Sequence, residues 1–414
     1  MDSPAESLSV GTGRFDFDKR PLVVVWEMTQ ACDLACLHCR AEAQPKRHPD
    51  ELTDREARDL LDQVADLDPG VLVLSGGDPM KREDVCDLVR HGCERGIRMA
   101  MTPSVTSLLT DAAIRRLAAA GLTRIAFSLD GSCPPVHDSF RGVPGSFART
   151  VEVIDVARRA GLTVQINTTV SRHNLDDLRP IADLLRNRAI SLWSVFFLVP
   201  VGRGQADQRI SPEEYEQVFE LLWSLRRQVR FEIKTTEAPH YRRFVLQKLK
   251  AERRADVSGG VLDKPFPNRA RQEADCGEQP PGHERPAPSR SRFGLAFPDS
   301  RGTDGCFRYA SMNVNDGRGF VFISHTGEVF PSGFLPLSVG NVRKARLADL
   351  YREAPLLRDL RNADNMGGKC GECEYRRVCG GSRARSWALS GDPFAPEPDC
   401  VYQPARSVPL PVRN

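Results

Sequence analysis

The sequence predicts an α/β fold, in which a partial (β/α)6 barrel of the TIM type precedes a small C-terminal domain. Between residues 22 and 236, short apolar or β-branched runs alternate with helical stretches. Each strand and helix pair takes about 30 residues, which is typical of a parallel sheet covered by helices. Six such pairs fall short of a complete barrel, and a doubly wound open sheet is the alternative. In either fold the working ends are the carboxyl ends of the strands.

The individual elements follow from local patterns. The predicted strands are residues 22–26, 71–75, 97–102, 124–130, 163–170 and 192–199. The predicted helices are residues 53–67, 82–95, 110–120, 147–160, 175–187 and 211–229. Thr53, with Glu56 three residues later, forms a capping pattern, and Ser211 is followed by Pro212 at the first helical position. Glycines that can end a helix follow three of the stretches, at Gly96, Gly121 and Gly161.

Four regions are expected along the chain: an N-terminal arm at 1–20, the barrel at 21–236, a helix with a mobile linker or insertion at 237–305, and the C-terminal domain at 306–414. Residues 250–305 are rich in Arg, Pro, Gly and Glu and poor in apolar residues, which is typical of a linker. The stretch "GFVFISHTGEVF" at 319–330 predicts two short strands joined by a turn.

Composition limits the classes of function. The charge balance, with 58 basic against 55 acidic residues, indicates neither a nucleic-acid nor a membrane partner. No apolar run approaches the roughly 20 residues of a membrane span, and the polar start MDSPAESLSV lacks the features of a signal peptide. In a long chain without a signal, 12 cysteines favour metal or redox chemistry over disulfides. A cytoplasmic protein is therefore expected.

The first cysteine group directly follows the first predicted strand. Cys32, Cys36 and Cys39 stand at C-x3-C-x2-C spacing, with no fourth cysteine nearby. A structural zinc site needs four ligands, and His38 is the residue that would supply the fourth in that alternative. Three thiolates on one short loop better suit a [4Fe–4S] cluster that keeps one iron open.

Further motifs follow in order behind this loop: "LSGGDP" at 74–79, "FSLDG" at 127–131 and "FRG" at 140–142. Together with the cysteine spacing they resemble the signature of radical S-adenosylmethionine (SAM) enzymes, over about residues 21–236 and 306–404. The resemblance implies that the open iron binds the amino and carboxylate groups of SAM. One electron then cleaves SAM to methionine and a 5′-deoxyadenosyl radical, which abstracts a hydrogen atom from the substrate.

The resemblance also assigns expected roles to single residues. Cys32, Cys36 and Cys39 match the cluster ligands, and His38 matches a ring that packs near the adenine. The methionine ammonium of SAM is expected to contact Gly76, Gly77 and Asp78. The SAM carboxylate is expected to contact Ser128 and Arg141, and the adenine is expected to contact Leu198. An Arg fork suits a carboxylate, and glycines allow close approach of the backbone to a ligand. Asp78 departs from the more usual Glu.

A second cysteine group lies near the C-terminus, where Cys370, Cys373, Cys379 and Cys400 give C-x2-C-x5-C-x20-C. Spacing alone leaves a four-cysteine zinc site open. The tail resembles the SPASM/twitch extension of radical SAM enzymes, and "CGGSRARSWALSGDPFAPEPDC" is similar to the tail of the alternative haem pathway enzymes. This resemblance implies one auxiliary [4Fe–4S] cluster that relays an electron. Ser332 stands where a two-cluster extension carries a cysteine, and Cys306 stays open as a ligand.

The remaining cysteines are predicted to be structural or have no assignment. Cys86 and Cys93 are expected on one face of a helix as core thiols, and Cys133 and Cys276 have no partner that the sequence identifies.

The substrate is less well defined by the sequence. The tail favours oxidative decarboxylation or another side-chain modification of a tetrapyrrole, with Arg203 either holding propionates or lying in a solvated loop. Modification of a ribosomal peptide is the alternative, and an iron–sulfur sensor or zinc-stabilised scaffold is the non-enzymatic one. A reducing partner such as flavodoxin or ferredoxin is expected, in addition to a small-molecule or peptide substrate.

Overall fold

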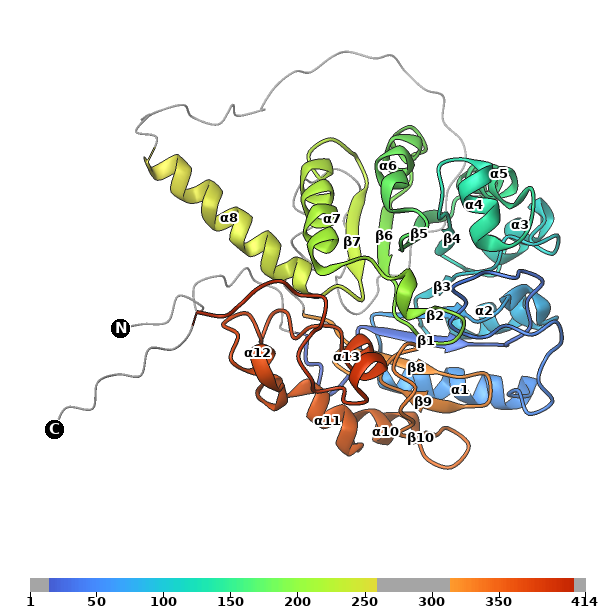
Figure 1. Ribbon diagram of the computed structural model, residues 1–414. Helices are drawn as coiled ribbons and strands as arrows, with labels where there is room; N and C mark the ends of the chain where they lie inside the picture. The colour runs from blue at the N-terminus through green and yellow to red at the C-terminus, as the bar shows by residue number, and fades with distance from the viewer. Residues whose placement is uncertain (1–14, 259–312, 406–414) are drawn as a thin grey trace, which may run out of the picture.

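A ten-stranded sheet organises the part of the chain that the computed structural model describes, residues 15–258 and 313–405 (Figure 1). Its strands lie in the order β10-β9-β8-β1-β2-β3-β4-β5-β6-β7. Strand β8 and strands β1 to β7 pair in parallel, whereas β9 pairs with β8 and with β10 in the antiparallel direction. The two ends of this order do not meet, so the predicted partial barrel is confirmed.

The strands are β1 (Val23–Glu27), β2 (Val71–Ser75), β3 (Met99–Met101), β4 (Arg124–Ser128), β5 (Thr163–Val170), β6 (Leu192–Phe197), β7 (Glu232–Thr236), β8 (Phe320–Ile323), β9 (Glu328–Phe330) and β10 (Gly340–Asn341). The helices are α1 (Asp54–Leu67), α2 (Val85–Glu94), α3 (Asp111–Ala119), α4 (Pro134–Arg141), α5 (Ser146–Arg159), α6 (Leu178–Arg186), α7 (Pro212–Leu225), α8 (His240–Ser258), α10 (Leu347–Glu353), α11 (Pro355–Arg361), α12 (Gly368–Gly371) and α13 (Arg383–Ser390). Single 3-10 turns lie at Pro79–Lys81, Leu175–Asp177, Ala206–Gln208 and Ala363–Asn365.

The helix boundaries follow the capping signals of the sequence. Thr53 and Glu56 form a complete capping box at the start of α1, and Ser211 forms one with Glu214 ahead of α7. Each box satisfies backbone N–H groups that the first turn of a helix leaves without a partner. The glycines after α2, α3 and α5 adopt positive φ angles of 81°, 105° and 83°, a conformation that costs glycine little. These predicted starts and ends are confirmed.

The count of six strands was too low. Strand β7 pairs in parallel with β6 and adds a seventh strand after α7. Its residues read Glu-Ile-Lys-Thr-Thr, so a search for apolar runs passes over it. The strand is polar because one of its faces borders a cavity, as described below, and a polar lining does not produce the apolar run of a fully buried strand.

Residues 319–330 form the predicted hairpin, whose strands β8 and β9 are antiparallel. Strand β8 also pairs in parallel with β1 over Val23–Trp26. The hairpin that the sequence places in the C-terminal domain therefore extends the barrel sheet on the side opposite β7.

Alternation along the strands separates a packed face from a cavity face. In β5, Val164, Ile166, Thr168 and Val170 are buried, whereas the residues between them are only partly buried. The buried set joins one large apolar core with the inner faces of helices α1, α2, α3, α5, α6 and α7, which lie around the outside of the sheet in Figure 1. The apolar core therefore packs between the outer face of the sheet and the helices. The inner face of the sheet is left to line a cavity.

A small C-terminal unit, made of α10 to α13 and their loops, packs against this barrel (Figure 1). Helix α10 lies against α1, and Arg343 pairs with Glu56 at 2.6 Å. Residues 15–20 of the arm lie beside the same unit, where Tyr351 donates a hydrogen bond to the carbonyl of Phe17 at 2.7 Å. These contacts join the C-terminal unit to α1 of the barrel and to the N-terminal arm.

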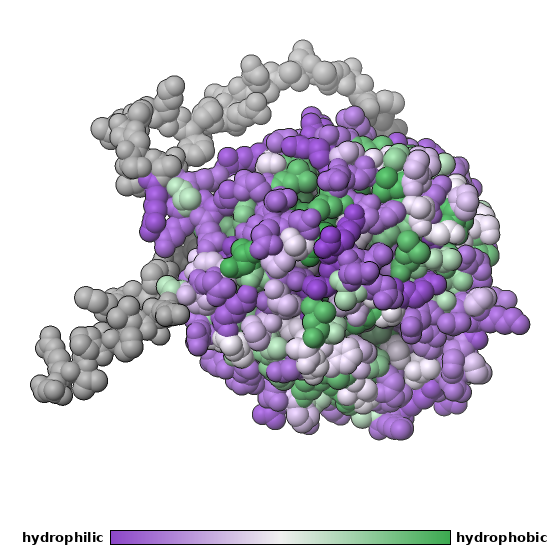
Figure 2. Space-filling model, viewed as in Figure 1, coloured by the Kyte–Doolittle hydropathy of each residue, from purple (hydrophilic) through white to green (hydrophobic). Residues whose placement is uncertain are grey.

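Some predictions fall outside the described residues. These are the arm at 1–14, the linker at 259–305 and the cysteines Cys276 and Cys306. Helix α8 continues to Ser258, so the first residues of the predicted linker segment at 250–305 are helical. Among residues 15–258 and 313–405, no helix has the length and apolarity that crossing a membrane would require. On the face shown in Figure 2, hydrophilic side chains predominate and apolar ones form small separate groups.

Candidate active site

The first cysteine group lies on the loop after β1 and lines a large cavity with a volume of about 450 Å³. Volumes of this size are typical of small-molecule sites. The cavity brings together nine of the residues that the sequence singled out: Cys32, Cys36, Cys39, His38, Gly76, Gly77, Ser128, Arg141 and Leu198. They come from the carboxyl ends of β1, β2, β4 and β6 and from α4, as expected for a β/α barrel.

Asp78 is the predicted residue that does not line this cavity. Its side chain is fully buried, accepting a hydrogen bond from Thr106 Oγ1 at 2.8 Å and another from the backbone N–H of Met80 at 3.1 Å. The carboxylate therefore caps the 3-10 turn that begins at Pro79. Its role in the described structure is to hold the loop after β2 in place.

The two glycines before Asp78 fit tightly against the cysteine loop. A Cβ atom at Gly76 would lie 2.4 Å from the carbonyl oxygen of Thr29, and one at Gly77 would lie 2.4 Å from that of Ala31. The N–H of Gly77 also donates to the carbonyl of Thr29 at 2.8 Å. The sequence predicted glycines for close approach to a ligand, and the structure adds a second reason. Only glycine lets the loop after β2 pack on the backbone that leads into Cys32.

Arg141 places a positive charge beside the cysteine loop. One guanidinium nitrogen lies 3.6 Å from Cys36 Sγ, and another is paired with the buried carboxylate of Asp130. Although burial acts to raise the pKa of Asp130, Arg141 beside it holds that pKa below its ordinary value. The ion pair fixes the guanidinium at the cavity. Ser128, the last residue of β4, lines the same cavity and precedes Asp130 by two residues.

His38 contributes a rigid aromatic wall. Its ring stacks on Phe140 with ring centroids 4.1 Å apart, and Phe140 stacks in turn on His173. Burial, with a further contribution from Arg141, lowers the pKa of His38 to about 3, so the imidazole is neutral at pH 7. Arg203 lies nearby, with its N–H on the carbonyl of Cys39 at 3.0 Å. Its side chain is partly buried and does not line the cavity, unlike either sequence interpretation.

The second cysteine group is also brought together in space. Cys370, Cys373, Cys379 and Cys400 line one small cavity of about 20 Å³ between α8, α12 and the last described loop. The N–H groups of Glu397 and Gly381 point at Cys370 Sγ and Cys379 Sγ, at 3.2 and 3.4 Å. Burial raises the pKa of Cys379 to about 12, so any metal that binds there must displace its proton.

The donor sets fit iron–sulfur groups in both places. Thiols are the ligands that such clusters use, and each group gathers them with nearby N–H or guanidinium donors to sulfur. In the part of the chain that is described, no three Cys, His, Asp or Glu side chains lie in an arrangement that could hold a metal ion. Cys86 and Cys93 stand apart from both groups on α2, partly buried against the core.

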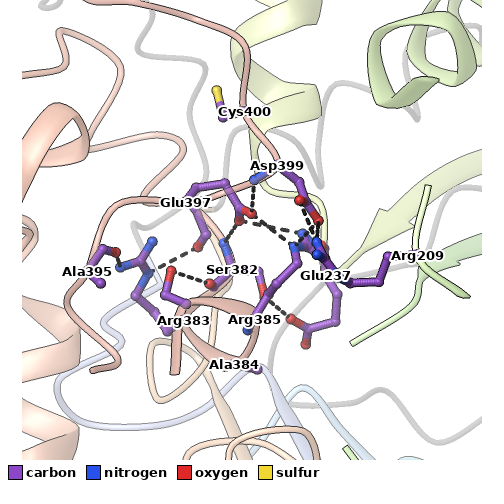
Figure 3. A network of polar contacts seen from close by, with 12 residues as sticks. Arg209, Glu237, Ser382, Arg383, Ala384, Arg385, Ala395, Glu397, Asp399 and Cys400 are labelled. Carbon is purple, nitrogen blue, oxygen red and sulfur yellow. Dashed lines mark hydrogen bonds and ion pairs between the residues drawn. The ribbon is translucent and has the colours of Figure 1, made fainter. Parts of the chain in front are cut away.

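A buried polar network lies next to Cys400 of the second group (Figure 3). Arg385 bonds Glu397 at 2.9 Å and pairs with Asp399 at 3.1 Å, and Asp399 also pairs with Arg209 at 2.6 Å. Ser382 donates its N–H to Glu397 at 2.6 Å and its hydroxyl to Glu237. Because Glu237 lines the large cavity and Cys400 adjoins Asp399, this network spans the wall between the two sites.

Sequence reasoning missed this network. Arg383, Arg385, Glu397 and Asp399 lie between cysteines in a polar stretch that reads as solvated, yet all are buried. The sequence did contain a signal: two basic residues at 383 and 385 precede two acidic residues at 397 and 399. Opposite charges at these positions allow ion pairs within this segment. Burial in such pairs satisfies each charge, and removing one partner would leave the other without compensation.

The comparisons with known proteins agree with this site. The profile of the Radical SAM superfamily matches residues 26–185. An "AdoMet-dependent heme synthase" of Methanosarcina barkeri is 35% identical over 386 residues, covering 93% of this chain and 98% of the relative. The chain belongs to the radical SAM superfamily. Another "AdoMet-dependent heme synthase", from Nitratidesulfovibrio vulgaris, is 38% identical over 94% of both chains. The "Fe-coproporphyrin III synthase" of M. barkeri is 27% identical over 94% of this chain and 89% of its own.

A solved structure supports the fold. Streptococcus suis SuiB bound to S-adenosylmethionine has a TM-score of 0.64 at 15% identity, over 93% of this chain and 78% of that one. Members of the superfamily bind SAM and a [4Fe–4S] cluster, and this chain is an enzyme of that kind. The predicted family, its resemblance to the haem branch and the predicted fold are confirmed. The non-enzymatic alternatives, a sensor or a scaffold, are set aside.

Proposed function

We propose that this radical SAM enzyme oxidatively decarboxylates propionate side chains of a tetrapyrrole. The observation that carries the substrate assignment is the identity of 35% and 38%, over nearly the whole chain, with two relatives named for haem synthesis. Haem carries vinyl groups where coproporphyrin carries propionates. Conversion of a propionate to a vinyl group releases carbon dioxide, one hydrogen atom and one electron. The chemistry therefore needs a hydrogen acceptor and an electron acceptor.

We infer that Cys32, Cys36 and Cys39 hold the first cluster and that the wall of the cavity receives SAM. Bound there, cluster and SAM supply a carbon radical that can take a hydrogen atom from a substrate. Arg141 and Ser128 are suited to the SAM carboxylate, since a guanidinium is already fixed at the cavity by Asp130. The neutral, stacked ring of His38 and the buried Leu198 offer apolar surface for the adenine.

We infer that Cys370, Cys373, Cys379 and Cys400 hold an auxiliary [4Fe–4S] cluster. Four thiols complete the ligand set of such a cluster, and the small cavity leaves no room for SAM or a substrate. The polar network between the sites supports a second role for these residues, because it keeps the auxiliary site next to the large cavity. An electron released from the substrate would then have an acceptor within the same chain. A flavodoxin or ferredoxin would supply the electron that starts each turnover.

The experiment follows a deuterium label. Fe-coproporphyrin III, deuterated on the propionate carbon attached to the ring, is incubated with SAM, dithionite and the anaerobic protein. A radical at that carbon lies next to the carbon that bears the carboxylate, so loss of carbon dioxide and one electron, which the auxiliary cluster would accept, yields the vinyl group. We expect deuterium in 5′-deoxyadenosine and a vinyl porphyrin as product. Unlabelled 5′-deoxyadenosine and unchanged porphyrin would reject the tetrapyrrole and leave peptide modification, which the similarity to haem synthases supports less, as the next substrate class to test.

A further inference from the structure

A row of side chains crosses the inner face of the sheet and ends in a lysine. The parallel register aligns Ser128 of β4 with Asn167 of β5, Asn167 with Ser194 of β6, and Ser194 with Lys234 of β7. Ser128, Asn167 and Lys234 all line the large cavity. Adjacent strands lie about 4.8 Å apart, so three steps separate Lys234 from Ser128 by about 14 Å along the sheet. Lys234 therefore lies three strands along the sheet from Ser128, which is one of the residues proposed for the SAM carboxylate.

The ammonium of Lys234 has no counter-charge paired with it among the described residues. Within residues 15–258 and 313–405, neither a hydrogen bond nor an ion pair reaches it. Burial lowers its pKa to about 8, and the charged groups that add to this shift, Arg124 and Arg242, are both cations. A lysine in this state is still mostly protonated at pH 7. An unpaired ammonium in a cavity wall is costly to desolvate, and an anionic ligand would remove that cost.

The acids near Lys234 have other partners. Glu232 lies two residues earlier on the same face of β7, and burial raises its pKa while Arg124 acts against that rise. Glu237 accepts a hydrogen bond from Ser382, and burial together with the neighbouring carboxylate of Asp316 raises its pKa to about 8. Asp316 also lines this end of the cavity, where its carboxylate accepts hydrogen bonds from the N–H groups of Arg383 and Ala384. These acids are therefore held by groups other than Lys234.

Arg242 is a second cation at this end of the cavity, and it lies next to the second cysteine group. Its guanidinium donates to three neutral oxygens, the side-chain oxygen of Asn313 and the carbonyls of Val314 and Val378. These bonds fix its position without neutralising it. Val378 directly precedes Cys379, and Arg242 lines the cavity. An anion at Lys234 would thus lie at the end of the cavity that borders the auxiliary site.

We propose that Lys234 binds a carboxylate side chain of the substrate and so orients it between the two cysteine groups. The assignment rests on the proposed function, in which the substrate carries several propionates. Arg242 contributes positive potential at the same end of the cavity. The SAM carboxylate is the other anion that enters this cavity, and its expected partners are across the sheet at Ser128 and Arg141.

The test titrates anaerobic, cluster-loaded protein with Fe-coproporphyrin III and follows the Soret absorbance. Lys234→Met removes the charge at similar volume, and Lys234→Arg keeps it. Lys344→Met removes an exposed lysine outside the cavity and serves as the matched control. Loss of one charged hydrogen bond is expected to weaken porphyrin binding by Lys234→Met at least about tenfold. Lys234→Arg and Lys344→Met should stay within about threefold of wild type. The tetramethyl ester of the same porphyrin should bind wild type and Lys234→Met equally.

Each outcome bears on a distinct statement. If wild type fails to bind Fe-coproporphyrin III, the proposed function fails and the lysine assignment fails with it. If wild type binds and Lys234→Met binds as well, the lysine assignment alone is wrong. If Lys234→Met instead weakens the binding of SAM, measured by equilibrium dialysis, then Lys234 serves the SAM carboxylate and the proposal is overturned. Circular dichroism spectra that match wild type confirm that each variant is folded.

Discussion

The two cysteine groups differ in what surrounds them. The first has three thiols on a loop at the carboxyl ends of the barrel strands, and it opens on a cavity of about 450 Å³. The second has four thiols around about 20 Å³, within the small C-terminal unit. The first cavity has the size of a small-molecule site, and the second is far too small for one. The group with three thiols has the larger space beside it, and the group with four thiols has the smaller. This difference is expected if the first group binds a reacting ligand and the second only carries electrons.

The electrostatics of the two groups differ in the same sense. Beside the first, Arg141 is held by Asp130 and the ring of His38 is neutral, so the residues present suit an anionic ligand such as a carboxylate. Beside the second, the buried pairs of Arg385 with Glu397 and Asp399 satisfy one another. Each site therefore pairs a buried arginine with carboxylates, but Arg141 lines the large cavity, where a ligand can reach it, and Arg385 does not.

The largest effect is expected from removing one thiol of the first group. Cys32→Ala should abolish formation of 5′-deoxyadenosine, lowering the rate at least about 100-fold, because three thiols are the fewest that can hold a cluster with one open iron. The assay measures 5′-deoxyadenosine by mass spectrometry under dithionite. Cys86→Ala, a partly buried thiol on α2 outside the cavity, is the matched control and should retain the rate. Equal activity in the two variants would contradict the comparison.

Removing a thiol of the second group should separate the two functions. In Cys373→Ala the iron content should fall from about eight to about four atoms per chain. Cleavage of SAM should continue in part, while formation of vinyl porphyrin stops because the released electron lacks its acceptor. Iron analysis and product analysis on one sample check both statements. A variant that still forms vinyl porphyrin at the wild-type rate would show that the second group does not serve turnover.

Gly77→Ala should disturb the first site alone. The added Cβ would lie 2.4 Å from the carbonyl oxygen of Ala31, so the backbone that leads into Cys32 has to move. A displacement of this kind near reacting groups lowers rates by about 100-fold, and we expect a loss of that order in SAM cleavage. Gly96→Ala places its Cβ in open space and should leave the rate near wild type, despite its unfavourable φ. Auxiliary iron should be retained in both, and a Gly77→Ala rate equal to that of Gly96→Ala would refute the packing argument.

The smallest effect concerns the contact between the barrel and the C-terminal unit. The hydrogen bond from Arg343 lowers the pKa of Glu56 to about 2, so its carboxylate stabilises the fold above about pH 5. That contribution is lost as pH falls toward 2. Because the pair is partly exposed, Glu56→Gln should lower the free energy of unfolding by no more than about 1 kcal/mol at pH 7. Near pH 2 the substitution should leave the free energy of unfolding unchanged. Urea unfolding at both pH values measures this, and an equal cost at both would remove the electrostatic explanation.

Much of this architecture could be predicted from the sequence because its signals are local. The capping box at Thr53 and the glycine after α2 fix helix ends within a few residues. The sequence order of three motifs also predicted that they share one site. The cysteine loop, the glycines at 76–77 and Arg141 do line the same cavity. Strand β7 was missed because its polar face borders the cavity, and polar strands lack the apolar run on which the prediction depends.

Other features depend on contacts between distant parts of the chain. The parallel pairing of β8 with β1 joins residues about 300 positions apart, and no local pattern reports it. Asp78 was assigned to SAM by its place in a motif, yet its carboxylate turns inward to Thr106. Lys234 was not singled out because its significance comes from the cations around it, which only the fold brings together.

The central claim is that the first cysteine group leaves one iron open to SAM. Electron paramagnetic resonance of the reduced Cys373→Ala protein tests this most directly, because that variant should retain only the first cluster. We expect addition of SAM to change the spectrum of that cluster, since amino and carboxylate groups would enter its coordination. A cluster spectrum that stays the same at saturating SAM, or a first site that contains zinc and no iron, would contradict the account.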